Sequence, residues 1–99
     1  MKRPVPMKVA AAAREMGANL SAWRRMQGLS SEEVAQRAGV SRSTVSRLEG
    51  GDASVGLATF LAVCRSAGVL DSVVRATDPY ETDFGRARAD MELPKRVRR

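Results

Sequence analysis

Apolar residues near the start of the chain recur at alternating spacings of four and three. The series is Val9, Ala13, Met16, Leu20 and Trp23. Residues three and four apart share one face of an α-helix, so this spacing predicts an amphipathic helix that runs to about Gln27. Gly28 is a natural stop for it. Residues 1–8 are predicted to form a flexible basic arm, because they hold two prolines beside Lys2 and Arg3.

Two short helices are predicted next. Ser31 opens a segment with acidic residues in its first turn, where the positive end of the helix dipole favours them. This helix is expected to cover residues 31–38 and to end at Gly39. Ser41 is well placed to cap a third helix over residues 42–49, which two glycines then end.

The remaining apolar positions predict two more helices and a tail. A helical stripe that ends at Gly68 is formed by Leu57, Phe60, Leu61 and Cys64. A shorter stripe, closed before Pro79, is formed by Leu70, Val73 and Val74. From residue 78 the chain is polar and charged. The pattern therefore predicts an all-α fold, with five helices over residues 9–77 and a largely extended tail over residues 78–99.

The segment from residue 31 to residue 49 has the spacing that a helix-turn-helix requires. Ala35 is small enough for the third helix to cross close over the second, and Gly39 can adopt the positive φ of a very short turn. The side chains expected to face inward are Val34, Ala38, Val40, Val45 and Leu48. The side chains expected to face outward are Arg42, Ser43, Thr44, Ser46 and Arg47.

The charge of the chain favours a polyanionic partner. Seventeen Lys and Arg residues against eleven Asp and Glu residues give a formal net charge of +6. Aromatic residues make up only 4% of the chain, which argues against the base-stacking platforms of single-strand binders. Duplex DNA is therefore the expected partner.

The composition argues against an enzyme. There is no histidine, no metal-ligand spacing and no phosphate-cradling glycine loop, and the three lysines lie outside the predicted core. We therefore expect no catalysis, no cofactor and no metal. The single cysteine, Cys64, cannot form an internal disulfide. No apolar run is longer than that from Val9 to Ala13, which is far too short to span a membrane. These features predict a cytoplasmic protein without a targeting or membrane segment.

Residues 16–76 resemble the Xre family, the helix-turn-helix domains related to phage Cro and repressor proteins. The resemblance is carried by Leu29-Ser30, by Glu33 to Ser41 with Ala35 and the Gly39-Val40-Ser41 turn, and by Ser46 to Gly51. It implies a five-helix, lambda-repressor-like bundle whose third helix lies in the major groove. It also implies a symmetric homodimer on a palindromic operator.

The resemblance assigns DNA-contacting roles to matching positions. The implied base readers are Arg42, Ser43, Thr44 and Arg47. An arginine can present two donors to guanine O6 and N7. The serines that would contact phosphates or bases at shorter reach are Ser31, Ser41 and Ser46. The family often has Gln at the position of Ser31, so the contact there can instead use the backbone N–H of the helix start.

Several other side chains have a structural and a functional interpretation. The resemblance implies that Arg24 pairs with Glu49, and the alternative is that both are solvated surface charges. Trp23, Phe60 and Cys64 lie on apolar stripes, which favours packing in the core over stacking or thiol chemistry. Arg25 and Arg37 could touch phosphates, but solvation is their default.

The tail leaves the biological role open between two hypotheses. Tyr80 and Phe84 are four residues apart, so a helical turn would put both on one face beside Arg86 and Arg88, as a partner-binding segment. The tail resembles antitoxins paired with HipA-type kinases, and such a protein represses its own operon. The alternative is a stand-alone phage or mobile-element repressor. The terminal cluster of Lys95, Arg96, Arg98 and Arg99 could follow DNA, dock on a partner or remain solvated.

Overall fold

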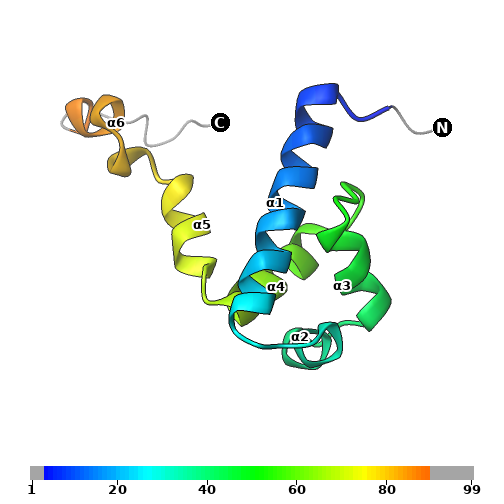
Figure 1. Ribbon diagram of the computed structural model, residues 1–99. Coiled ribbons are helices and arrows are strands. Elements are labelled where there is room, and N and C mark those ends of the chain that lie inside the picture. The colour runs from blue at the N-terminus through cyan, green and yellow to red at the C-terminus, as the bar shows by residue number, and fades with distance from the viewer. Residues whose placement is uncertain (1–3, 90–99) are drawn as a thin grey trace.

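The computed structural model describes residues 4–89, and within them every regular element is a helix (Figure 1). The elements are α1 (Met7–Met26), α2 (Ser31–Ala38), α3 (Arg42–Glu49), α4 (Leu57–Ala67), α5 (Leu70–Ala76), the 3-10 helix η1 (Pro79–Glu81) and α6 (Asp83–Ala87). The predicted all-α fold is confirmed. No helix in the described part of the chain combines the length and the apolar character needed to cross a membrane.

The first helix begins earlier than predicted. The predicted flexible segment includes residues 7 and 8, but α1 already starts at Met7, and the N–H of Ala10 donates to the carbonyl of Pro6 at 2.9 Å. Pro6 has a φ of −56°, close to the helical value, so it leads into a helix that the following alanine-rich residues favour.

A capping box fixes the start of α2. The Ser30 hydroxyl accepts from the N–H of Glu33 at 3.0 Å, and the Glu33 carboxylate accepts from the N–H of Ser30 at 2.8 Å. These bonds, chiefly the one from the Ser30 backbone, hold the pKa of Glu33 below its usual value. The cap is therefore Ser30 rather than Ser31, which is the first helical residue.

The turn between α2 and α3 follows the prediction. Gly39 has a φ of +73°, so it supplies the left-handed conformation that ends α2. Ser41 caps α3 by accepting from the N–H of Thr44 at 3.1 Å. Three residues thus connect the two helices, which fixes the angle at which α3 leaves α2.

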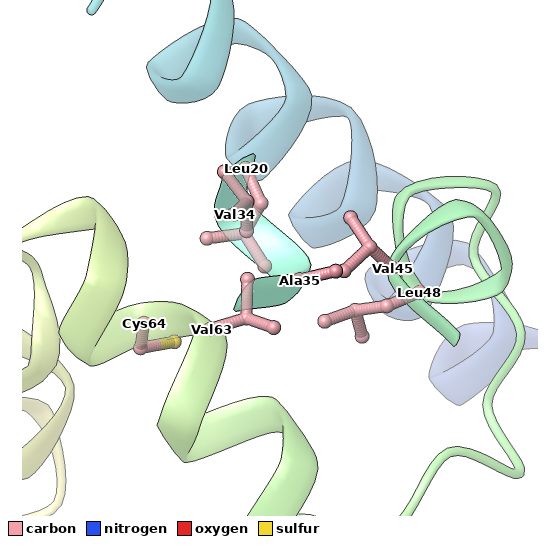
Figure 2. Packing of buried hydrophobic residues seen from close by; sticks show 7 residues of the cluster. All are labelled: Leu20, Val34, Ala35, Val45, Leu48, Val63 and Cys64. Carbon is pink, nitrogen blue, oxygen red and sulfur yellow. The ribbon is translucent and has the colours of Figure 1, made fainter. Parts of the chain in front are cut away.

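The core lies where α1 to α4 meet, and its side chains come from all four helices (Figure 2). The buried apolar residues are Leu20, Val34, Ala35, Val45, Leu48, Val63 and Cys64. Val45 is completely inaccessible to solvent. Burial raises the pKa of the Cys64 thiol, as expected for a residue that packs as a small apolar group. Ala38, Val40 and Phe60 are partly buried against this core, so the predicted inward face is confirmed.

The closest approach of α1 to α3 occurs at a glycine. Gly17 is buried, and a Cβ atom there would lie 2.8 Å from the carbonyl oxygen of Glu49 and closer still to that of Leu48. Real Cβ atoms essentially never approach another atom below 3.0 Å. Only glycine therefore allows α1 to rest on the C-terminal end of α3, the helix expected to contact DNA.

Most of the apolar stripe of α1 is not buried. Leu20 lies in the core, but Trp23 is 43% exposed, and Val9 and Met16 are also exposed. The expectation that Trp23 packs in the core was wrong. A helix of 20 residues is about 30 Å long. It is therefore longer than the short helices that it packs on, and much of its stripe faces an open groove.

The tail is not extended as predicted, because residues 79–87 form η1 and α6. The Asp78 carboxylate accepts from the N–H of Tyr80 at 2.9 Å, and the Thr82 hydroxyl accepts from the N–H of Gly85 at 2.9 Å. Gly85 is buried, and a Cβ atom there would overlap the Pro79 carbonyl. Local caps and one close glycine contact thus fold a segment whose charge had suggested an extended chain.

The helices α5 and α6 form a C-terminal arm, which we define as residues 70–89. From here on, "the arm" means this segment and not the basic segment of residues 1–8. The helix α5 packs on α4, α6 packs on η1, and α6 lies on the opposite side of α1 from α3 (Figure 1). The terminal basic cluster that begins at Lys95 lies outside the described residues.

Candidate nucleic-acid interface

The exposed face of α3 has short side chains at its centre and arginines at its two edges. Successive residues of an α-helix are about 100° apart. Val45 and Leu48 point into the core, so the opposite face centres on Ser43 and Ser46. Arg42 and Arg47 lie on the two flanks of that face, and all four residues are exposed. This arrangement leaves a shallow strip with a long cationic side chain on each side.

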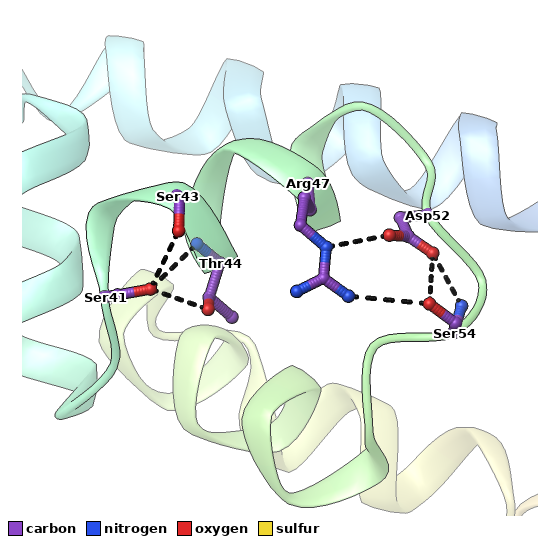
Figure 3. Close-up of polar contacts among 6 residues, drawn as sticks. All are labelled: Ser41, Ser43, Thr44, Arg47, Asp52 and Ser54. Carbon is purple, nitrogen blue, oxygen red and sulfur yellow. Dashed lines mark hydrogen bonds and ion pairs between the residues drawn. The ribbon is translucent and has the colours of Figure 1, made fainter.

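Hydrogen bonds among hydroxyl groups order the N-terminal end of α3 (Figure 3). The Ser41 Oγ lies 2.8 Å from Thr44 Oγ1 and 3.1 Å from Ser43 Oγ, in addition to its bond with the Thr44 N–H. Thr44 is half-buried, so its hydroxyl serves the cap and is not fully outward as predicted. The structure brings these three predicted residues together at the helix start.

The two predicted arginine readers differ in how they are held. Within residues 4–89, no hydrogen bond or ion pair holds the Arg42 side chain, which is exposed. The Nε of Arg47 instead donates to Asp52 Oδ2 at 2.8 Å, and its Nη2 lies 3.5 Å from Ser54 Oγ (Figure 3). Arg47 thus points outward as predicted but has partners in the loop that follows α3.

The Asp52 carboxylate is satisfied on both oxygens. Its Oδ1 accepts from the Ser54 hydroxyl at 2.6 Å and from the Ser54 N–H at 2.9 Å. The hydroxyl of Ser54 first, and then the Arg47 guanidinium, hold the pKa of Asp52 far below its usual range. Asp52 therefore carries its negative charge beside α3 at any pH near neutrality.

A bidentate ion pair fixes α3 to α1. The Arg24 Nε donates to Glu49 Oε2 at 2.9 Å, and its Nη2 donates to Glu49 Oε1 at 3.1 Å. The Nη1 of Arg24 also donates to the Leu29 carbonyl at 3.0 Å. The hydrogen bonds to Glu49 raise the pKa of Arg24, and both side chains are mostly shielded from solvent. The predicted Arg24–Glu49 pair is confirmed.

Replacing Arg24 with lysine is expected to lower the free energy of unfolding by about 1–2 kcal/mol. Lysine keeps the charge but cannot bond both Glu49 oxygens and the Leu29 carbonyl at once. Urea unfolding followed by circular dichroism would measure the loss. Arg25→Lys is the matched control, because Arg25 makes only an exposed bond to the Ser21 carbonyl. An equal effect of both substitutions would show that the ion pair adds nothing.

Comparison with known proteins identifies the family of this domain. Residues 15–77, which span more than half of the chain, match a family described as a helix-turn-helix domain. The chain belongs to this helix-turn-helix family. No curated protein and no solved structure matches the chain. Domains of this family are of the DNA-binding regulator type, so the partner class expected from charge and motif is supported.

The helix-turn-helix match ends at Thr77, the last residue before the capped turn of the arm. The part of the arm after Thr77, which holds η1 and α6, therefore has no support from the comparisons, and neither has the antitoxin resemblance. Of the residues predicted there for partner binding, Phe84 is 67% exposed and Tyr80 is also exposed. They lie in separate helices joined at Thr82, not on one continuous helical face as predicted.

The arginines of the arm stabilise its own fold. Arg86 donates to the Tyr80 carbonyl at 2.9 Å and to Asp83 at 2.8 Å, and Arg88 stacks over the Phe84 ring at 3.8 Å. Both arginines remain exposed. They can therefore support a contact surface around Phe84 as well as the turn itself.

Three residues that shape the helix-turn-helix site are not among those predicted from the sequence. In the sequence pattern, Gly17 is one more residue of a helix, and Asp52 and Ser54 are part of a loop. A signal exists for the latter pair, because an aspartate two residues before a serine favours a local side-chain turn. A glycine inside an otherwise alanine-rich helix also indicates a close packing contact.

Proposed function

We propose that the protein is a transcriptional regulator that binds double-stranded DNA sequence-specifically by placing α3 in the major groove. The observation that carries this proposal is the exposed face of α3, where Ser43 and Ser46 lie between Arg42 and Arg47. A major groove about 12 Å wide admits one α-helix, and short central side chains let the helix approach the base edges. The flanking arginines then reach guanines or phosphates.

Ser31 and Ser41 are proposed to contact the DNA backbone. Ser41 lies at the start of α3, where the N–H groups of the first turn and the helix dipole favour a phosphate. Ser31 lies in the first turn of α2, but Glu32 and Glu33 share that turn and bring negative charge to it. We therefore assign the stronger phosphate contact to the start of α3.

Replacing Arg42 with alanine is expected to weaken binding to the selected operator by about 2 kcal/mol, roughly 30-fold, with little change in thermal stability. The operator would first be selected from a random duplex library, and affinities would then be measured by fluorescence anisotropy on single-base variants. Arg75→Ala is the matched control, because Arg75 is an exposed arginine on α5, in the arm. Equal loss of affinity for every DNA sequence would show that Arg42 binds phosphate rather than a base.

The protein is further proposed to act as a homodimer on an inverted repeat. Apolar side chains line a groove between α1, α4 and α5, among them Met16, Trp23, Phe60 and Val73. Val74 on the neighbouring face of α5 is 58% exposed. A surface of this kind on a small domain is stabilised when a second copy covers it. Sedimentation equilibrium should give the dimer mass, and footprinting should show half-sites about one DNA turn, roughly 10 bp, apart.

The arm favours a second role, in which the protein is the antitoxin of a HipA-type toxin kinase. The antitoxin and the kinase together would then repress the operon that encodes them. The specific observation is that α6 carries the exposed Phe84 and lies on the opposite side of α1 from α3 (Figure 1). A partner bound there would leave the DNA-binding helix free. The alternative is a stand-alone repressor of phage or mobile-element type, for which the arm would have no toxin to bind.

A further inference from the structure

The loop after α3 returns along the side of that helix and reaches Arg47. The Asp52 N–H donates to the Arg47 carbonyl at 3.0 Å, so the loop is attached to the helix at the same residue whose side chain it contacts. The Asp52 carboxylate and the Ser54 hydroxyl then lie beside the Arg47 guanidinium (Figure 3). The side chain of Arg47 is 51% exposed, so one part of it is held and the rest faces solvent.

The loop contacts one edge of the guanidinium and leaves the other open. An arginine has five N–H donors in a planar fork. Asp52 takes the Nε donor, and Ser54 faces Nη2 on the same edge. Within residues 4–89, Nη1 has no hydrogen-bond acceptor. The outer edge, made of Nη1 and the remaining hydrogen of Nη2, is therefore the edge available to a ligand, and this fork matches guanine O6 and N7.

The way Asp52 is bonded makes it a rigid support. Its Oδ1 is occupied by two bonds from Ser54, so the carboxylate cannot rotate away without losing them. A long side chain that is already oriented loses less rotamer freedom on binding than a free one. The fixed negative charge also repels phosphates near Arg47, which disfavours contacts with the DNA backbone at this position.

We propose that Asp52 and Ser54 are positioning residues, which hold Arg47 so that its outer edge reads one guanine of the operator and not a phosphate. The inference rests on the proposed function, because it requires that the α3 face enters the major groove. It makes this loop a determinant of sequence specificity although neither Asp52 nor Ser54 is assigned a contact with a base. Within residues 4–89, the side chain of Arg42 has no such support, so the two arginines differ in how firmly they are held before they meet DNA.

The test compares base preference across variants of the full chain: Arg47→Ala, Asp52→Ala, Asp52→Asn and Ser54→Ala. Each is measured on the selected operator, on its single-base variants and on random duplex DNA at two salt concentrations. Asp52→Ala should lower the discrimination at one base position, the position that Arg47→Ala affects, by about five- to tenfold. Affinity for random duplex should rise about two- to threefold because a negative charge is removed. Thermal unfolding confirms that each variant is folded.

Further variants distinguish a loop that positions Arg47 from a loop that only stabilises the fold. The double variant with Arg47→Ala should discriminate no worse than Arg47→Ala alone, because Asp52 acts through that arginine. Asp52→Asn should retain part of the preference, since its amide oxygen can still accept from Ser54 or from Arg47. A fall in melting temperature with base preference unchanged in both Asp52 variants would overturn the inference. So would an equal loss of preference at every position.

The control Arg42→Ala distinguishes failure of this inference from failure of the proposed function. If Arg42→Ala changes a base preference and Arg47→Ala changes none, α3 still reads DNA and only the role of Asp52 and Ser54 is refuted. If the unaltered protein selects no sequence from the library, the proposed function fails, and this inference fails with it.

Discussion

Replacing Gly17 with alanine is expected to lower the free energy of unfolding by about 3 kcal/mol, although alanine is the better helix former. Helix propensity alone would stabilise α1 by about 1 kcal/mol. The new methyl group, however, would lie 2.8 Å from the Glu49 carbonyl oxygen and closer to that of Leu48. Neither backbone atom can move aside as a flexible side chain would, so the cost falls at the upper end of the roughly 1–3 kcal/mol typical of overpacking. The steric cost is therefore expected to exceed the gain in helix propensity.

The same substitution at Gly56 provides the control for Gly17→Ala. Gly56 is the N-cap of α4 with a φ of −68°, and a Cβ atom there would meet nothing within 4 Å. Gly56→Ala therefore loses only the N-cap preference for glycine and should lower stability by about 1 kcal/mol or less. Urea unfolding of both variants measures the contrast. Operator affinity should also fall in Gly17→Ala, because α3 has to shift away from α1. Unchanged or increased stability of this variant would mean that α1 and α3 do not approach as closely as described.

The elements that could be predicted from the sequence are those whose stabilising contacts are local. Helices α2 to α4 begin and end beside glycines and serines that cap or break helices, and α5 begins just after Gly68 and ends just before Pro79, so their bounds follow from the chain itself. The turn at Gly39 and the small residue Ala35 follow from the tight geometry of two helices joined by three residues. The pairing of Arg24 with Glu49 follows from the resemblance to a family and not from spacing.

What could not be predicted depends on packing between distant parts of the chain. Trp23 lies on a proper apolar stripe, but whether a stripe is buried depends on which helices cover it, and α5 leaves α4 without covering α1. The partner of Arg47 is five residues away in a loop whose Gly51 packs closely against Arg14 of α1, a contact between distant parts of the chain. The fold of the arm depends on Gly85 meeting the Pro79 carbonyl, a contact that composition does not reveal.

Replacing Gly85 with alanine is expected to abolish capture of a protein partner while leaving operator binding intact. The added Cβ atom would overlap the Pro79 carbonyl, so η1 and α6 could not pack as they do, and Phe84 would lose its fixed position. The helix-turn-helix match ends at Thr77, before this contact, so α3 should keep its geometry. The toxin of an antitoxin is encoded beside it, so a pull-down against the product of the neighbouring gene measures capture. Gly56→Ala is again the matched control.

Truncation after Thr77 distinguishes a tail that binds a protein partner from a tail that follows DNA. The deletion removes five acidic and six basic residues, so the net charge changes by only one. If the tail binds a protein, the truncated chain should keep its operator affinity and nearly the same salt dependence, but no longer capture the partner. If the tail instead follows DNA, affinity should fall for all sequences, and the salt slope should flatten by about 0.9 for each phosphate that the protein no longer neutralises. Partner capture by the truncated chain would refute the antitoxin proposal for the arm. Failure of the full chain to bind the neighbouring gene product would favour the stand-alone repressor.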